Sequence, residues 1–273
     1  MEQKIDPETL TSRRFFLAEG TRLFTMAGVG GALISGLGVT DEASAQGWRS
    51  LFRRTPEGGH GRVKKVQGEA TAAGRPLKVG DRVESGEEIR VGKQGTMILS
   101  LADNTIFRIN GEAKFQVHTS QRRRTGFFRL LLGSILTVMP RRNRYLVQMP
   151  SASIGIKGTI FFHQIYGEEE FFASDYGGKI VALPEGISEY FCLCNGLADF
   201  LKTDEDKAFF SDVSKYHNSY YIDPKNSKIL VKAPQLNHTD DDILELIEFQ
   251  EEPKHDSRWI GDYRATYKPD PAP

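Results

Sequence analysis

Apolar and polar residues alternate along much of the middle of the chain, as expected for β-strands with one buried face. The clearest case is a predicted hairpin, whose apolar positions share one face on either side of a polar turn at residues 103–104: Met97, Leu99, Leu101, Phe107 and Ile109. Further strand-like runs follow at residues 130–138, 145–149, 153–166 and 179–183. No long amphipathic pattern interrupts these runs, so the sequence predicts a mainly β domain over residues 60–183.

The pattern changes after residue 183, where strict alternation gives way to helical spacing. Leu197, Phe200 and Leu201 recur at intervals of three and four, which is typical of one face of a helix. We therefore expect helix within residues 196–214.

A second helix is predicted to begin after Thr239, because threonine is a good N-cap and three aspartates follow it in the first turn. Its apolar face would comprise Ile243, Leu244 and Ile247. Together the two helices predict a small α-rich extension over residues 184–252. Beyond it, residues 253–273 contain scattered charge and several prolines, and we expect an irregular tail there.

The first 45 residues have the features of an export signal. Residues 12–17 read S-R-R-F-F-L and match the twin-arginine pattern S-R-R-x-F-L at every specified position. A mildly apolar run, Leu23–Val39, lies behind them, and the small residues Ala43-Ser44-Ala45 suit cleavage after Ala45. The sequence predicts a signal peptide over residues 1–45 and a Gly/Pro-rich linker over residues 46–59.

The alternative interpretation of this region is a retained membrane anchor. The apolar run is 17 residues long and contains five glycines, which places it at the short limit for a bilayer span. We favour cleavage and expect no stable membrane span in the mature chain.

Charge and composition narrow the classes of function. The chain has 36 basic and 36 acidic residues, and cleavage after Ala45 would leave 32 and 30. A near-neutral protein lacks the long-range attraction that non-specific nucleic-acid binding requires, so we expect no nucleic-acid partner. Two cysteines in 273 residues exclude a scaffold held by several disulfides, and apolar burial must therefore hold the core.

An ordered series of short motifs resembles the FecR domain family. The motifs are Val66-Gln67-Gly68, Leu77-Lys78-Val79-Gly80-Asp81, Ile89-Arg90-Val91-Gly92, Leu99-Ser100-Leu101-Ala102-Asp103-Asn104-Thr105, Leu132-Gly133-Ser134-Ile135 and Ser153-Ile154-Gly155-Ile156-Lys157-Gly158-Thr159. Their Gly-Asp and Asp-Asn pairs suit turns between strands, while Gly155 and Gly158 allow close backbone approach. The series spans residues 60–183 and is far more specific than any single motif.

The resemblance implies a β-helix-like or rolled antiparallel domain, used in the family as an extracytoplasmic module for signalling or protein binding. Well-known members carry a cytoplasmic anti-sigma segment before a membrane span, whereas only residues 1–11 precede the twin arginines here. Lys157 also stands where the family usually has arginine. Proteins with similar twin-arginine signals cross the inner membrane folded, often with a cofactor already inserted. We expect a free periplasmic protein that binds an envelope protein partner.

The residues of the extension most suited to a chemical role are its two cysteines, Cys192 and Cys194. Residues two apart on a strand face the same side, so Cys192 and Cys194 are expected to point together, with Phe191 and Leu193 on the opposite, apolar side. A disulfide between them would have to close a very small ring with a Cα spacing of roughly 6.5 Å, near the upper limit. The pair therefore favours ligation of zinc, copper or iron.

Two downstream histidines could complete a tetrahedral site. His238 directly precedes the predicted N-cap, where it would be held in a fixed place, and His217 lies in a polar and aromatic stretch. Cys192, Cys194, His217 and His238 are thus the candidate metal ligands. The alternative is that the cysteines are small buried hydrophobic residues and the histidines are hydrogen-bonded loop residues.

Charged residues gather at two places in the β region. The basic group comprises Arg122, Arg123, Arg124, Arg129, Arg141, Arg142 and Arg144, and the acidic group comprises Glu168, Glu169 and Glu170. Opposite charges could guide a partner. We favour the alternative that both groups are solvated loops, which keep edge strands from pairing with other chains.

Sequence signatures of common enzyme mechanisms are missing: there is no G-x-S-x-G elbow, Walker A loop, H-E-x-x-H helix or dinucleotide fingerprint. Asp81 and Asp103 lie in turns, so we assign them structural roles. We expect a non-enzymatic periplasmic FecR-domain protein that binds or signals to an envelope partner. Two alternatives remain, a metal-dependent redox or metal-handling protein that uses the Cys-x-Cys and histidine site, and a cell-wall glycan-binding module.

Overall fold

The computed structural model describes residues 59–120, 125–175, 177–201, 208–222 and 230–250. Four sequence predictions lie outside the described residues: the signal peptide over residues 1–45, the linker up to residue 58, the run Arg122-Arg123-Arg124 and the tail over residues 253–273. Within the described ranges, no helix is long and apolar enough to cross a membrane.

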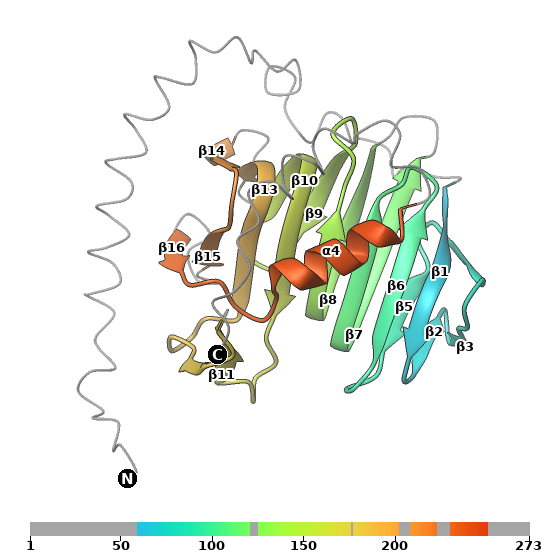
Figure 1. Cartoon of the computed structure of the whole chain (residues 1–273), viewed down its shortest axis with the longest axis horizontal. Coiled ribbons are helices and arrows are strands. Elements are labelled where there is room, and N and C mark those ends of the chain that lie inside the picture. The colour runs from blue at the N-terminus through green and yellow to red at the C-terminus, as the bar shows by residue number, and fades with distance from the viewer. Residues whose placement is uncertain (1–58, 121–124, 176, 202–207, 223–229, 251–273) are drawn as a thin grey trace.

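Sixteen strands and one helix make up the described part of the chain (Figure 1). In chain order the strands are β1 (His60–Gln67), β2 (Ala70–Ala72), β3 (Arg75–Pro76), β4 (Arg82–Glu84), β5 (Glu88–Val91), β6 (Thr96–Leu101), β7 (Ile106–Ser120), β8 (Thr125–Val138), β9 (Arg144–Gln148), β10 (Ser153–Ile165), β11 (Phe172–Ser174), β12 (Ile180–Ala182), β13 (Glu189–Leu201), β14 (Ala208–Ser214), β15 (Asn218–Ile222) and β16 (Leu230–Ala233). The helix is α4 (Asp240–Glu248). The mainly β class predicted from the sequence is confirmed.

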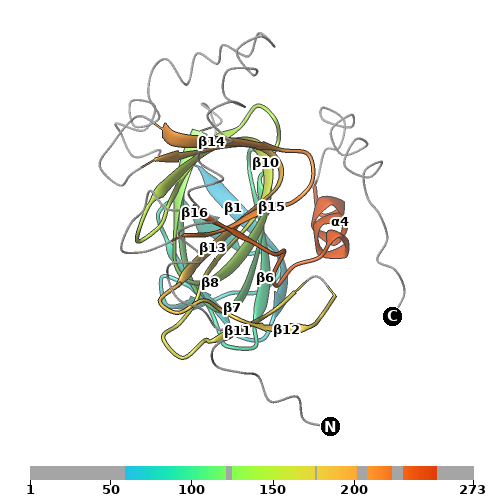
Figure 2. The same cartoon turned by 90° about the vertical axis from the view of Figure 1, so that its left-hand side faces the viewer.

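Fourteen of the strands form one sheet. Its longest path of neighbouring strands runs β16-β15-β13-β10-β9-β8-β7-β5-β2-β3. Strand β14 pairs with β13, β6 pairs with β7, and β1 pairs with both β4 and β6. The described pairs are antiparallel apart from β8 and β9, which are parallel. Viewed from one end, the sheet curls round an interior and α4 lies outside it (Figure 2). The rolled antiparallel form expected from the family resemblance is therefore confirmed.

The interior of the roll is filled by aromatic and branched side chains. The predicted hairpin is β6–β7, with Met97 opposite Ile109 and Leu99 opposite Phe107, and all four side chains face this interior. A chain of ring contacts with centroids 5.1–5.8 Å apart then crosses the roll through Phe107, Phe115, Phe128, Phe161, Phe191 and Phe200. Such pairs stabilise a core by about 0.5–1.5 kcal/mol each beyond their area burial.

Both aspartates assigned to turns have the structural role expected of them. The carboxylate of Asp103 accepts a hydrogen bond from the Thr105 amide at 3.0 Å, and that of Asp81 accepts one from the Lys78 amide at 3.0 Å. Each side chain thus closes a tight turn by binding the backbone, as Asp commonly does.

The backbone at Gly158 of β10 is closely approached by a neighbouring segment, as the motif predicted, and the strand changes partner there. Before Gly158 it pairs with β9, and after it with β8. Gly158 has φ +53°, and a Cβ there would lie 2.2 Å from the Cα of Arg141. Gly196 of β13 lies against the same position, because a Cβ on it would meet the Gly158 carbonyl oxygen at 2.8 Å. A side chain at either position would force the strands apart.

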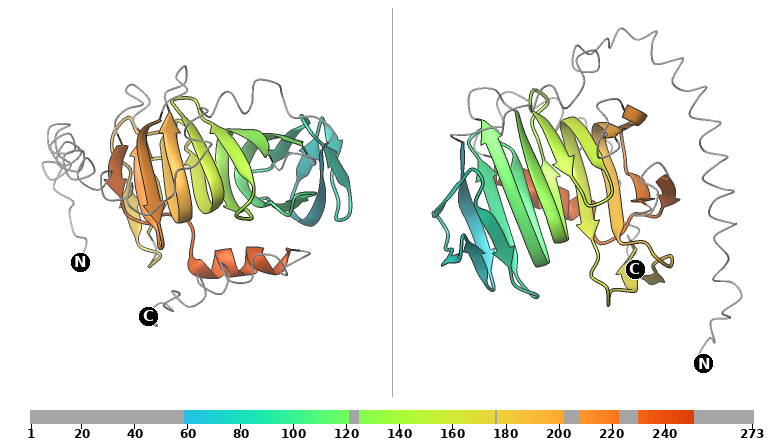
Figure 3. Two further views of the ribbon diagram at one scale, coloured as in Figure 1. Left: turned by 90° about the horizontal axis from the view of Figure 1, so that it is seen from above. Right: turned by 180° about the vertical axis from the view of Figure 1, so that it is seen from behind.

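Helix α4 lies along the outer face of the sheet (Figure 3). A second apolar cluster lies between the helix and this face. Ile243, Leu246 and Ile247 of the helix are buried against it. The helix begins as predicted: Thr239 is the N-cap and forms a capping box with Asp242. Arg108 on β7 binds Asp242, and Lys65 on β1 binds Glu245 at 2.8 Å, so ion pairs flank the apolar contact.

The helix predicted within residues 196–214 is wrong for the described residues, because residues 196–201 form the end of β13 and residues 208–214 form β14. Ala198 and Phe200 face the roll interior, whereas Leu201 packs on the other side against Leu146. A strand that is buried on both faces has no polar alternation, and its apolar residues can then imitate helical spacing. The extension over residues 184–252 is accordingly not α-rich. A division of the chain at residue 183 stays a prediction, and β13 pairs directly with β10 across it.

His163 predicts a measurable pH dependence of stability. This imidazole is wholly buried in the roll, neither ring nitrogen has a hydrogen-bond partner among the described residues, and burial lowers its pKa from 6.5 to about 3. Below pH 6.5 the unfolded chain takes up a proton that the native imidazole does not, so the free energy of unfolding falls as the pH drops.

Between pH 7 and pH 5 the contribution of His163 is about 2 kcal/mol. Urea unfolding at both pH values should show that His163→Leu loses less stability on acidification than the wild type, by about this amount. An equal loss in both proteins would show that burial of this imidazole does not cause the fall in the free energy of unfolding at acid pH.

Candidate metal centre

Strand β13 positions the two cysteines as predicted. Phe191 and Leu193 belong to the roll interior, whereas Cys192 and Cys194 belong to the outer cluster beneath α4. Both thiols are wholly buried and free, with their sulfur atoms 3.8 Å apart. A disulfide requires about 2.05 Å, so these sulfurs are spaced as a pair of ligands and not as a bond.

His217 reaches the cysteines from the turn between β14 and β15. Its Nδ1 lies 3.3 Å from the Sγ of Cys192, and its backbone amide donates to the Cys194 carbonyl at 3.1 Å. The residue has φ +38°, in the left-handed region. That conformation costs a non-glycine residue of the order of 1 kcal/mol, and observed strain of this kind is typical of functional positions.

His238 enters from the opposite side, on the segment that leads into α4. Its Nε2 lies 3.4 Å from the Sγ of Cys194 and 3.3 Å from the Nδ1 of His217. The ring of Phe162 stacks on it, with centroids 4.5 Å apart. Since Thr239 caps the helix directly after it, the backbone of His238 is fixed, as the sequence predicted.

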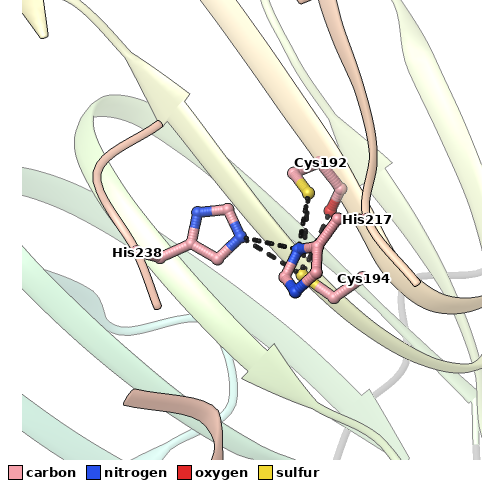
Figure 4. A group of neighbouring side chains, drawn as sticks. All are labelled: Cys192, Cys194, His217 and His238. Carbon is pink, nitrogen blue, oxygen red and sulfur yellow. Dashed lines mark hydrogen bonds between the residues drawn. The ribbon is translucent and has the colours of Figure 1, made fainter. Parts of the chain in front are cut away.

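The four ligand atoms lie around a common point (Figure 4). A regular tetrahedron with zinc bonds of about 2.05 Å to nitrogen and about 2.3 Å to sulfur has edges of about 3.3 Å (N–N), about 3.6 Å (N–S) and about 3.8 Å (S–S). The observed edges are 3.3 Å for N–N, 3.3 and 3.4 Å for two N–S pairs and 3.8 Å for S–S. The remaining two pairs lie within 4.8 Å. Sequence reasoning therefore identified four residues that the fold does bring together.

Hydrogen bonds on the far side of each imidazole set its orientation. The Nε2 of His217 lies 2.9 Å from a carboxylate oxygen of Asp240, and the Nδ1 of His238 lies 2.7 Å from the Leu236 carbonyl oxygen. Because both acceptors carry no proton, each of these ring nitrogens is the donor. The other nitrogen of each ring then points into the cluster, which is the usual arrangement around a protein-bound metal.

Burial and the mutual contacts of the ligands shift the pKa values of the two thiols and of His217. Burial alone raises the pKa of the Cys192 thiol, but the hydrogen bond from Cys194, the charge of His238 and the hydrogen bond to His217 hold it well below its usual range. Burial and the neighbouring Cys192 sulfur raise the pKa of Cys194 well above its usual value. Burial lowers the pKa of His217, whereas Asp240 and Cys192 raise it, with a net value of about 9. Metal binding would release the protons that the thiols and imidazoles of the cluster still carry.

Four protein ligands determine what such a site can do chemically. Structural metal sites are closed by four protein ligands, whereas catalytic zinc sites keep one position open for water or substrate. Two thiolates and two imidazoles are suited to zinc, and thiolates also accept copper(I) and iron. Since the cysteines are wholly buried and His238 is 4% exposed, the arrangement is suited to holding an ion permanently.

Asp240 is the member of the site that the sequence prediction missed. It was identified as a favourable residue for the helix N-terminus, and its side chain instead binds His217 and accepts a hydrogen bond from the Tyr216 hydroxyl at 3.0 Å. It is 1% exposed, while Asp241 beside it is exposed. The sequence contains three consecutive aspartates, residues 240–242, and nothing in it shows which of them is buried.

Part of the β region matches the model of a known protein family. Residues 87–173 match the family model described as FecR protein. This segment is therefore similar to FecR proteins. The recognition made from the motifs over residues 60–183 is thereby confirmed for the larger part of that range, and the candidate metal centre lies beyond the FecR match.

Solved structures and curated proteins add little to the FecR match. Two crystal structures of a proposed anti-sigma factor from Parabacteroides distasonis ATCC 8503 align with 12% identity and a TM-score of 0.40 each. The alignments cover 54% of this chain and 59% of theirs, so the chain spans less than two thirds of that protein. No curated protein matches the sequence.

The contact between Asp240 and His217 predicts that replacing Asp240 will weaken metal binding. Asp240→Asn removes the charge that orients His217, and such a change beside a metal ligand weakens metal binding by about 10–100-fold. Competition with a chromophoric chelator measures the affinity for zinc. Asp241→Asn is the matched control, since it removes the same charge from the same helical turn at an exposed position. Equal zinc affinities in the two variants would show that Asp240 does not support metal binding.

Proposed function

We propose that this protein is a non-enzymatic signalling or binding module of the cell envelope that carries one metal ion, foremost zinc, on Cys192, Cys194, His217 and His238. The observation that carries the proposal is the convergence of these four buried ligand atoms with tetrahedral spacing. The FecR segment supports the regulatory part of the proposal. The closed ligand set supports a structural or regulatory ion in place of a catalytic one.

The ion would join three parts of the fold that are distant in the sequence. Two ligands come from β13, one from the turn before β15 and one from the segment before α4. A metal bond among them closes long loops that otherwise depend on apolar contacts and half-exposed ion pairs. Binding to the native state alone stabilises it by about 2.7 kcal/mol when the free ion is at 100 times its dissociation constant.

We also propose that the chain is exported through the twin-arginine route and acts in the periplasm. The signal over residues 1–45 supports this, and so does the burial of the ligands, because a buried ion is most simply inserted while the chain folds. Export of the folded protein would then deliver the loaded form to the envelope.

Metal content tests the central part of this proposal. Protein purified without added metal should contain about one equivalent of zinc, copper or iron, and Cys192→Ser combined with Cys194→Ser should contain less than about a tenth of an equivalent. A chelator should lower the melting temperature of the wild type by roughly 5–10 °C and leave that of the double variant unchanged. Wild-type protein that is free of metal and insensitive to both zinc and chelator would contradict the proposal.

Export has its own test. Arg13→Lys combined with Arg14→Lys should leave the protein as an unprocessed cytoplasmic precursor, whereas Arg22→Lys, outside the motif, should leave export unchanged. Immunoblots of periplasmic and cytoplasmic fractions measure both. Normal export of the double variant would show that the twin-arginine route is not used.

A further inference from the structure

The hairpin β11–β12 exposes apolar side chains on its outer face. Ala173 and Val181 pack inward on the cluster beneath α4. On the opposite face Phe172 lies across from Ala182, and Ile180 follows on the neighbouring strand. Phe171, Phe172 and Ile180 are each 63% exposed, as much as any large apolar side chain of the described structure. Exposed apolar patches of this kind mark interaction sites more often than chance exposure does.

Acidic residues border this patch on one side. Glu168, Glu169 and Glu170 directly precede Phe171, and all three are exposed. The loop is held in shape, because Glu170 accepts a hydrogen bond from the Gly167 amide at 2.6 Å. Lys179 lies at the turn of the hairpin, so the border is mainly and not wholly negative. A complementary surface would combine an apolar pocket with lysine or arginine.

The same hairpin is joined to the metal centre through residues 236–238. Ser174 and Asn237 exchange two hydrogen bonds of 2.8 Å, one from the Asn237 amide to the Ser174 carbonyl and one from the Ser174 amide to the Asn237 side chain. Leu236 forms an isolated β-bridge with Asp175 and also accepts the ring N–H of His238. Asn237 has φ +57°, so the segment is held in a conformation that its own backbone does not favour. One peptide bond separates this contact from a proposed metal ligand.

We propose that the outer face of β11–β12 is a docking surface for a protein with an apolar pocket bordered by basic residues, and that the metal ion keeps this surface in position through residues 236–238. The coupling to the metal rests on the proposed metal centre, whereas the docking surface does not. A protein occupant is favoured over a membrane because the negative border would be repelled by anionic lipid headgroups. Association would be steered by charge and completed by burial of the two phenylalanines.

Photo-crosslinking of the full-length protein in its own cells tests the docking surface. A benzophenone amino acid replaces Phe172 in one variant and Val79 in the control, since Val79 is equally exposed at 63% but lies in the turn between β3 and β4, at the N-terminal end of the sheet. We expect an adduct with a single protein at position 172 and none at 79. The crosslinked peptide should contain lysine or arginine, and the yield should fall at least fivefold when Glu168, Glu169 and Glu170 are all changed to Gln. Equal adducts at both positions, insensitivity to the charge change, or adducts with lipid or a second copy alone would overturn the proposal.

Hydrogen exchange tests the coupling to the metal. In the zinc-loaded protein the Ser174 and Asn237 amides should exchange at least tenfold more slowly than after chelation, while the Phe115 amide in the roll should not change. Asn237→Gly permits the positive φ but removes the side-chain hydrogen bonds, so it should speed exchange at Ser174 with zinc content unchanged. Zinc binding without any change at Ser174 would overturn the coupling alone. Absence of zinc binding would instead overturn the proposed function, and the crosslinking result would stand independently.

Discussion

The structure depends on strand β13, which is buried on both faces and serves a different purpose on each. Its inward residues, Phe191, Leu193 and Phe200, complete the aromatic filling of the roll. Its outward residues, Cys192 and Cys194, lie beneath a helix and are wholly buried. Because side chains alternate strictly along a strand, the packing of the interior fixes the direction of both sulfurs. If β13 slipped by one residue along β10, its aromatic side chains would leave the core and its two cysteines would turn away from the histidines. The register of β13 against β10 therefore fixes both the core and the candidate site.

The outer face of the sheet carries both the candidate metal ligands and the proposed docking surface. Two imidazoles are oriented by Asp240 and by the Leu236 carbonyl, and the segment that supplies the second of these also pairs with the exposed hairpin. Regulation in such an arrangement requires no movement of the roll, whose interior is a continuous aromatic core. What changes with the metal is the order of a short segment at its border. The FecR-like strands would then serve as the scaffold, and the proposed contacts would lie at the surface.

Local patterns predicted the parts of the molecule that depend on local physics. Alternation predicted the β6–β7 hairpin and the common direction of Cys192 and Cys194, and capping preferences predicted where α4 begins. Sequence reasoning was wrong within residues 196–214, where the end of β13 is buried on both faces and loses polar alternation. It also missed Asp240 as the partner of His217, since that role depends on how a helix docks on a distant strand. The link between Asn237 and Ser174 is likewise set by tertiary contact and leaves no trace in spacing.

The central claim is that two sulfurs and two imidazole nitrogens hold one ion, and X-ray absorption of the protein as purified measures this directly. The spectrum at the metal edge should fit two sulfur neighbours at about 2.3 Å and two nitrogen neighbours at about 2.0–2.1 Å, with no ordered water in the shell. A shell of oxygen and nitrogen alone, or a single sulfur with open positions, would contradict the claim and assign the buried thiols to packing.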